Sequence, residues 1–167
     1  QFTAMKFSTT LNEFPYREGD TVDLAVRIEK NEFRGEVKAT VQIRDIRFAG
    51  VDEDNLFKSL ALYEKFKRGE KLNSHEARFL TPSREFLLGV YGLIKNYKIW
   101  TFDIETMLVR AKCPYERYCI MLVSLDVLCE LGLIKRDGEH IIFDGDGKKA
   151  DLSQSKILKI LTEMQGE

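Results

Sequence analysis

The stretch EKNEFRGEVKATVQIRDIRF, residues 29–48, carries polar side chains at alternate positions from Lys38 to Arg44, and they are basic or amide groups apart from Thr40. Residues two apart in an extended strand share one face, so Lys38, Gln42 and Arg44 are expected to lie together. Cations on such a face can follow the phosphates of a single nucleic-acid strand, and an aromatic ring beside them can stack on a base. The candidate DNA-binding residues are therefore Arg27, Phe33, Arg34, Lys38, Gln42 and Arg44.

Acidic residues are interspersed with these basic groups and weaken the positive potential of the face. Asp23, Glu29, Glu32 and Glu36 all lie in or beside the same alternating runs. The whole chain has a net charge of -1 and a pI near 6.2, so any nucleic-acid site must be a local patch. From these residues alone, nucleic-acid binding and an ordinary solvated or protein-facing surface both fit the pattern.

Residues that could form a catalytic or metal centre are few and scattered. The two histidines, His75 and His140, have no Cys, His or carboxylate at the spacing of metal ligands and no nucleophile motif nearby. Cys113, Cys119 and Cys129 are odd in number and include no Cys-x-x-Cys pair, which argues against a disulfide framework or a zinc site. The sequence therefore predicts a binding chain with no cofactor and no catalytic residue of its own.

The composition is that of a globular protein, with 44% hydrophobic and 32% charged residues in a chain of 167. The longest apolar runs, such as CIMLVSL, are far shorter than the roughly 20 residues that span a bilayer, so no membrane partner is expected. No signal peptide is visible and the cysteines suit a reducing compartment, which predicts a cytoplasmic protein. Because the chain starts on QFTAMKF without an initiator Met, we expect it to be part of a longer protein.

The N-terminal part of the chain has β periodicity. Apolar and polar residues alternate over 22–28 and again over 37–43, and the apolar sets are expected to face a core. The segment NEFRG joins the two runs, and Asn31 and Gly35 tolerate positive φ, so a hairpin with a five-residue loop is predicted. The alternation breaks at Asp45, which predicts a β-bulge there and favours a small curled barrel over a flat sheet.

The remainder of the chain has helical periodicity and one further hairpin. After an acidic start the periodicity becomes amphipathic, and three helical patterns follow, the last from Pro114 to Leu131. Two β-rich runs then flank the turn Asp137-Gly138, and helix, helix, helix, hairpin is the order of a winged helix. The predicted fold class is α+β, with a partial OB-like β-barrel at 1–50, a helical linker at 51–80 and a winged-helix-like domain at 81–167.

Several short motifs fall within roughly residues 4–48. They are an Ala-x-x-Phe strand, a Gly-Asp pair before an apolar strand, an Asn-x-aromatic-x-Gly turn, and Gln, Asp and Arg in the next strand. In this combination they resemble the OB-fold domain of RecJ, a family of single-stranded-DNA-specific 5′→3′ exonucleases. The matching residues are Ala4, Phe7, Gly19, Asp20, Asn31, Phe33, Gly35, Gln42, Asp45 and Arg47. The later residues resemble the C-terminal extension of some bacterial RecJ proteins.

The resemblance implies a C-terminal fragment of a RecJ-like exonuclease that begins partway into the OB-fold. Enzymes of this family are hydrolases whose DHH core holds Mn or Mg, and the motifs of that core do not occur in this sequence. The basic face would then hold single-stranded DNA for a core outside this chain, with Asn31 and Gly35 shaping the turn and Asp45 pinning the bulge. The implied partners, in DNA repair and recombination, are single-strand-binding protein or a helicase.

The predicted winged helix offers a second binding surface. Its third helix carries few cations, and Glu116, Asp126 and Glu130 would oppose the approach of a phosphate backbone. Interfaces between proteins favour aromatic residues and Arg. Protein docking or bracing, duplex binding and auxiliary single-strand contact all fit, with docking favoured as the alternative function of the chain. The candidate partner-binding residues are Arg110, Lys112, Tyr115, Arg117 and Tyr118.

Overall fold

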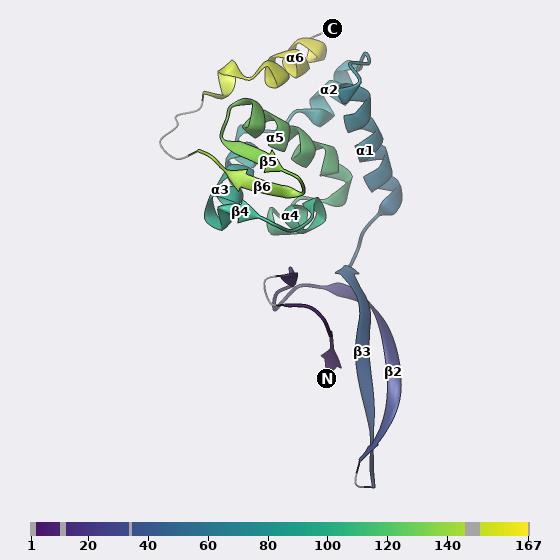
Figure 1. Ribbon diagram of the computed structural model, residues 1–167. Helices are drawn as coiled ribbons and strands as arrows, with labels where there is room; N and C mark the ends of the chain where they lie inside the picture. The colour runs from purple at the N-terminus through teal and green to yellow at the C-terminus, as the bar shows by residue number, and fades with distance from the viewer. Residues whose placement is uncertain (1–2, 11–12, 34, 146–150, 167) are drawn as a thin grey trace. The chain divides into compact units, whose positions relative to one another are not determined.

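The computed structural model describes residues 3–10, 13–33, 35–145 and 151–166, without the side chains of Phe33 and Glu36. The fold class is α+β, with helices and small sheets, as the periodicity predicts. The chain divides into two compact units, Gln1–Val51 and Asp52–Glu167, which we call the N-terminal unit and the C-terminal unit. Figure 1 shows the elements of each unit.

The N-terminal unit contains a three-stranded sheet in the order β1-β3-β2. Its strands are β1 (Ala4–Met5), β2 (Val22–Phe33) and β3 (Glu36–Phe48). β2 and β3 pair antiparallel in a long curved ribbon, and the short β1 pairs parallel with β3 (Figure 1). The strands described here form an open sheet and no closed barrel.

An aromatic cluster anchors the loop before β2 to the end of β3. The ring of Tyr16 contacts the rings of Phe14 and Phe48, with centroid distances of 5.2 and 4.8 Å. The Tyr16 hydroxyl also donates to the backbone carbonyl of Ile46 at 2.6 Å. Because Phe48 is buried, this cluster is the small core of the N-terminal unit, and it holds only one end of the ribbon.

The tip of the hairpin is tighter than the sequence predicts. β2 continues to Phe33, which pairs with Glu36 at the start of β3, so the predicted five-residue loop is wrong. The turn role predicted for Asn31 is wrong, because this residue lies within β2 and pairs with Lys38. Gly35 does have positive φ, at 80°, a region that residues with a Cβ rarely adopt. Strand pairing therefore continues up to Phe33 and Glu36, and the chain reverses next to Gly35, the residue with positive φ.

The break in alternation near Asp45 is a β-bulge, as predicted. The register shifts between Ala25 and Val26, which leaves Arg44 as the extra residue of β3. The backbone N–H of Ile46 donates to the Asp45 carboxylate at 2.9 Å. A bulge lets the strand bend and moves the following apolar residues back to their original face.

The C-terminal unit is mainly helical and contains a second three-stranded sheet, in the antiparallel order β4-β6-β5 (Figure 1). The strand β4 was not predicted, because two residues are too few to show a period. The helices of the C-terminal unit are α1 (Glu53–Lys67), α2 (Ser74–Leu80), α3 (Arg84–Tyr97), α4 (Ile104–Arg110), α5 (Tyr118–Glu130) and α6 (Lys156–Gln165). The other elements are η2 (Tyr115–Arg117), η3 (Leu152–Gln154), β4 (Ile99–Trp100), β5 (Ile134–Asp137) and β6 (His140–Phe143).

The helix α5 is the central element of the C-terminal unit. Eight of its 13 residues are buried, and seven of them contribute to two apolar clusters. Met121 and Leu125 pack with residues of α3, α4 and the sheet. Val123 and Val127 pack with residues of α1, α2 and α6. A helix that is apolar on both sides must be covered on both sides, and here the other helices and the sheet do so.

The segment 51–80, predicted as a linker, forms α1 and α2 and packs on α5. The Ser59 hydroxyl accepts the backbone N–H of Cys119 at 2.8 Å and so caps the first turn of α5. Tyr63, Leu80 and Ala77 are buried in the same cluster. These helices therefore belong to the C-terminal unit, because their apolar stripes need the surface that α5 provides. None of the described helices is long and apolar enough to cross a membrane.

Candidate functional site

The pairing register brings most of the candidate DNA-binding residues to one face of the ribbon. Arg27 lies opposite Gln42, Glu29 opposite Thr40, and Asn31 opposite Lys38. Directly opposite residues in an antiparallel pair project to the same side. With the bulge residue Arg44, they form a surface that we call the polar face. Its residues are Arg27, Glu29, Asn31, Lys38, Thr40, Gln42 and Arg44.

Carboxylates neutralise part of the positive charge of this surface. Arg27 Nε lies 2.8 Å from Glu29 Oε1, and the Gln42 amide donates to the same carboxylate at 3.5 Å. Further along the ribbon, Arg47 Nε lies 3.3 Å from Asp23 Oδ2. These pairs are exposed, so each contributes little stability and can open. A phosphate would have to compete with Glu29 for the Arg27 guanidinium.

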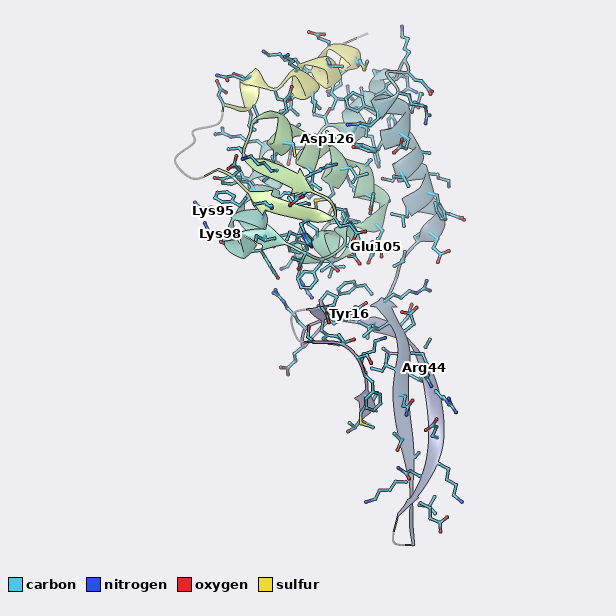
Figure 2. The ribbon with its side chains drawn as sticks, in the orientation of Figure 1. Tyr16, Arg44, Lys95, Lys98, Glu105 and Asp126 are labelled. Atoms are coloured by element: carbon cyan, nitrogen blue, oxygen red, sulfur yellow. The ribbon has the colours of Figure 1, made fainter. Side chains whose placement is uncertain are left out.

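Arg44 differs from the other cations because of the bulge. Its side chain is exposed and extends from β3 (Figure 2). The guanidinium forms no ion pair with the described side chains, whereas the Arg44 carbonyl accepts the Lys6 ammonium at 2.9 Å. The extra residue of a bulge has no directly opposite neighbour. Arg44 is therefore the cation of the polar face most accessible to an anion.

Two further candidates lie at the tip of the hairpin. Phe33 is the last residue of β2, but its side chain is not described. Arg34 lies outside the described residues. Whether an aromatic ring extends the polar face therefore stays a prediction.

The opposite face of the ribbon is apolar and exposed, which the sequence did not predict. Val26 lies opposite Ile43 and Ile28 opposite Val41, as the alternation predicts. However, Ile28 is 68% exposed and Val26 41% exposed, so these side chains do not face a core within the N-terminal unit. The strands supply an apolar face, but only the aromatic cluster at one end covers it. Large exposed apolar surfaces of this kind are typical of interaction sites.

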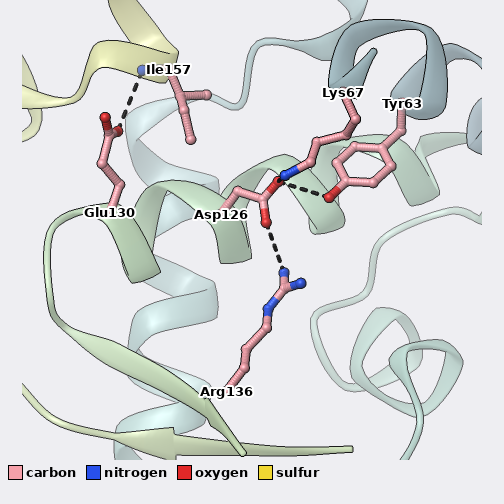
Figure 3. Close-up of polar contacts among 6 residues, drawn as sticks. All are labelled: Tyr63, Lys67, Asp126, Glu130, Arg136 and Ile157. Carbon is pink, nitrogen blue, oxygen red and sulfur yellow. Dashed lines mark hydrogen bonds and ion pairs between the residues drawn. The ribbon is translucent and has the colours of Figure 1, made fainter. Parts of the chain in front are cut away.

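In the C-terminal unit, α5 is not available as a recognition helix, because α1, α2 and α6 cover its outer side. Asp126 links these layers, as Figure 3 shows. Its carboxylate accepts the Tyr63 hydroxyl at 2.7 Å and lies 3.0 Å from both Lys67 Nζ and Arg136 Nη2. Burial, followed by the hydrogen bond to Asp126, raises the pKa of Tyr63 far above its ordinary value. Asp126 therefore acts within the fold and is not a free anion opposing DNA.

Glu130 also has an internal role. Its carboxylate accepts the Ser155 hydroxyl at 2.5 Å and the backbone N–H of Lys156 at 2.9 Å. It also accepts the backbone N–H of Ile157 at 3.4 Å, as Figure 3 shows. Burial opposes ionisation, but these donors hold the pKa of Glu130 below its ordinary value. An anion at a helix N-terminus is stabilised by the unpaired N–H groups there. Glu130 thus joins α5 to α6.

Two of the candidate partner-binding cations lie in one cleft. Lys112 and Arg117 line a cleft of about 340 Å³ whose apolar wall includes Phe86 and Ile120. Lys112 also lines a neighbouring groove along α3, together with Arg110. The Arg117 guanidinium lies 5.3 Å from the centre of the Phe79 ring, which favours one orientation of its side chain. The sequence placed these cations correctly near the start of the third helix but did not show the cleft.

The two candidate tyrosines are less accessible than predicted. Tyr115 and Tyr118 are half-buried and pack against the core cluster of α3, α4 and the sheet. Burial raises the pKa of Tyr118, with smaller contributions from Glu105, labelled in Figure 2, and Asp103. The rings therefore contribute mainly to the core and only in part to a surface.

The cysteines and acidic residues form no reactive centre in the described part of the chain. All three cysteines are free thiols, and burial raises the pKa of Cys113 to about 11, so this thiol is protonated at neutral pH. Among the described residues, no three His, Cys, Asp or Glu side chains are grouped so that they could hold a metal ion. Comparison with protein-family models, curated proteins and solved structures finds no match to this chain.

Proposed function

We propose that this chain is the DNA-holding and docking part of a RecJ-like single-stranded-DNA exonuclease, with the ribbon acting as an OB-like surface. The DHH core, with its Mn or Mg, would lie outside this chain. One observation carries the proposal: the register that gathers Arg27, Lys38 and Gln42 on one face, with Arg44 projecting at the bulge. The motifs of residues 4–48 that resemble RecJ come from the same ribbon.

The polar face suits a flexible, sequence-tolerant ligand better than a duplex. Its cations lie along one side of the ribbon, and single-strand surfaces combine such cations with aromatic rings on which any base can stack, a role that we propose for Phe33. Exposed ion pairs such as Arg27–Glu29 open at a small energetic cost, so a phosphate can replace the carboxylate. Because the N-terminal unit has as many acidic as basic residues, we expect weak binding that depends strongly on salt.

Binding of a fluorescent oligonucleotide, followed by anisotropy over a range of salt concentrations, tests this proposal. Arg44→Glu should weaken binding and reduce the slope of log K against log salt by about 0.7 for each lost phosphate contact. Lys30→Glu is the matched control, because Lys30 is exposed on the opposite face of the same ribbon and the charge change is identical. Equal effects of the two variants, or none, would exclude the polar face as the site.

We propose as a second candidate function that the C-terminal unit docks a protein partner. The helices α3, α4 and α5, with β4 between the first two and the hairpin β5–β6 after the third, fit a winged-helix-like arrangement, which commonly binds duplex DNA through its third helix. Here α5 is covered, and its carboxylates Asp126 and Glu130 are held by internal partners. The cleft with Lys112 and Arg117 remains, and it combines cations with an apolar wall.

A ligand for this cleft should be acidic and hydrophobic, such as the C-terminal tail of a single-strand-binding protein or a segment of a helicase. Titration of the chain with an acidic peptide ending in an aromatic residue, and separately with a mixed-sequence duplex, distinguishes the possibilities. Lys112→Glu should abolish peptide binding, whereas Lys95→Glu, an exposed lysine on α3 outside the cleft, should not. Tight duplex binding without peptide binding would refute docking.

A further inference from the structure

The strand β2 is an edge strand of 12 residues. It pairs with β3 on one side, and no strand of the described chain pairs with its other side (Figure 1). The unpaired N–H and C=O groups of such an edge are a template for a further strand. Natural proteins usually keep exposed edges short or interrupt them with bulges, but the bulge of this ribbon is on β3.

The distal part of the ribbon also lacks a third strand. β1 pairs only with Val41 and Gln42, so the segment of β2 beyond Ile28 belongs to a two-stranded ribbon. Two-stranded ribbons are at best marginally stable in water, and a third strand or a covering layer is normally needed. This segment exposes apolar side chains, with Ile28 68% and Val37 57% exposed. The unpaired edge and the lack of a third strand therefore favour an additional strand beside β2.

The sequence of β2 is complementary to itself when two copies run antiparallel. The apolar faces of both copies lie on the same side of a continuous sheet only if even-numbered residues pair with even-numbered ones and odd-numbered residues with odd-numbered ones. If Ile28 lies on the two-fold axis, Arg27 of each copy lies opposite Glu29 of the other. The Arg27 and Glu29 side chains are 61% and 40% exposed and already lie 2.8 Å apart within one chain. In the dimer, the two pairs would form an alternating cluster of four charges.

The neighbouring registers are less favourable. If the two-fold axis moves from Ile28 to Arg27, the Arg27 residues of the two copies lie opposite each other. If it moves to Glu29, the two Glu29 residues lie opposite each other. Like charges directly opposite each other destabilise strand pairing, whereas opposite charges stabilise it. The charges of β2 therefore select the register with Ile28 on the axis.

We propose that β2 pairs antiparallel with β2 of a second copy of this chain about a two-fold axis at Ile28. The result is one continuous sheet in which Val26 and Ile28 of both copies share an apolar face. An isologous contact of this kind is closed and gives a dimer and not a fibre. The proposal is independent of DNA binding, and its tests are made without nucleic acid.

A charge-swap experiment tests the register. Arg27→Glu places four carboxylates in the cluster and Glu29→Arg places four cations there, so each variant alone should dimerise about tenfold more weakly than the parent. An equimolar mixture should regain dimers, because each Glu of one chain then faces an Arg of the other. Sedimentation equilibrium over a range of concentrations measures all three samples.

The control mixture is Lys30→Glu with Glu32→Lys, which changes the net charges identically but on the opposite face of β2. These variants should dimerise like the parent, with no gain on mixing. A parent chain that stays monomeric at all concentrations, or a control mixture that gains as much as the test mixture, would overturn the proposal.

Disulfide formation gives an independent test of the axis. Residues directly opposite each other have Cα atoms about 4.5–5.5 Å apart, within the range that a disulfide spans. Ile28→Cys should therefore form a covalent dimer under mild oxidation. Lys30→Cys, on the same face and also exposed, should not, because its two copies would be about 14 Å apart. Efficient cross-linking at position 30 and none at position 28 would refute the register.

Discussion

Removal of the Asp126 carboxylate should destabilise the C-terminal unit more than any surface charge does. This side chain is only 10% exposed and receives three donors, from α1, from the end of α1 and from β5. Its partners are Tyr63, Lys67 and Arg136 (Figure 3). Asp126→Ala deletes the acceptor common to all three and leaves the rest of α5 unchanged.

The size of this destabilisation depends on how exposed to solvent each donor is. Tyr63 is 7% exposed, so its hydroxyl would stay buried without its partner, at a cost of about 1–3 kcal/mol. Lys67 and Arg136 are 48% and 43% exposed, so they regain hydration and lose only about 0–1 kcal/mol each. Together these contributions predict that Asp126→Ala lowers the free energy of unfolding by about 1–5 kcal/mol.

Urea denaturation followed by circular dichroism measures this loss. Glu139→Ala is the matched control, because it removes one carboxylate from the exposed turn between β5 and β6. Asp126→Asn should fall between the two, since an amide oxygen can accept from Tyr63 but carries no charge. If Asp126→Ala unfolds at the same urea concentration as Glu139→Ala, the carboxylate does not join the helices and the assignment is wrong.

Three further changes have expected outcomes. Ser59→Ala should lower the free energy of unfolding by about 1–3 kcal/mol, because the buried N–H of Cys119 loses its acceptor; Ser74→Ala, at an exposed position of α2, is its control in the same denaturation assay. Gly35→Val should cost about 1–3 kcal/mol through strain at positive φ, seen as faster amide exchange in β2 and β3, and unchanged exchange would contradict the turn geometry. Because folding lowers the pKa of Glu130, its contribution to stability is complete above the ordinary pKa of 4.5 and is lost as the pH falls through the folded-state pKa. Amide exchange in α6 should therefore become faster in acid in the parent chain, and Glu130→Gln should lack this acid-dependent change.

The local features of the ribbon could be predicted because they depend on neighbouring residues. Period-two alternation gave both strands, the break in alternation gave the bulge at Asp45, and the glycine gave the positive φ of the turn. The loop length was wrong, because Asn31 tolerates a turn but equally allows pairing. Strand pairing continues wherever backbone hydrogen bonds can form, so the preference of one residue for turns was overridden.

Features that depend on tertiary partners could not be predicted in the same way. The stripe on α1 was visible, but the sequence did not show that α5 would receive it, so 51–80 was interpreted as a linker. Asp126 and Glu130 read as surface anions in the sequence for the same reason, since donors such as Tyr63 and Ser155 lie 63 and 25 positions away from them along the chain. The apolar residues of β2 were assigned to a core that the N-terminal unit does not build.

The two units differ in how many of their apolar and hydrogen-bonding groups are covered or paired, and this difference supports the binding surfaces that we propose. In the C-terminal unit, the central helix is covered on both sides and its carboxylates are used by internal donors, which leaves a cleft between cations and an apolar wall. In the N-terminal unit, the strand edge, the apolar face and the Arg44 guanidinium all remain exposed. Exposed apolar and backbone groups are destabilising unless another molecule covers them. The ribbon therefore gains more from binding than the helical unit does, and association should protect the amides of β2 from exchange before it affects those of α5.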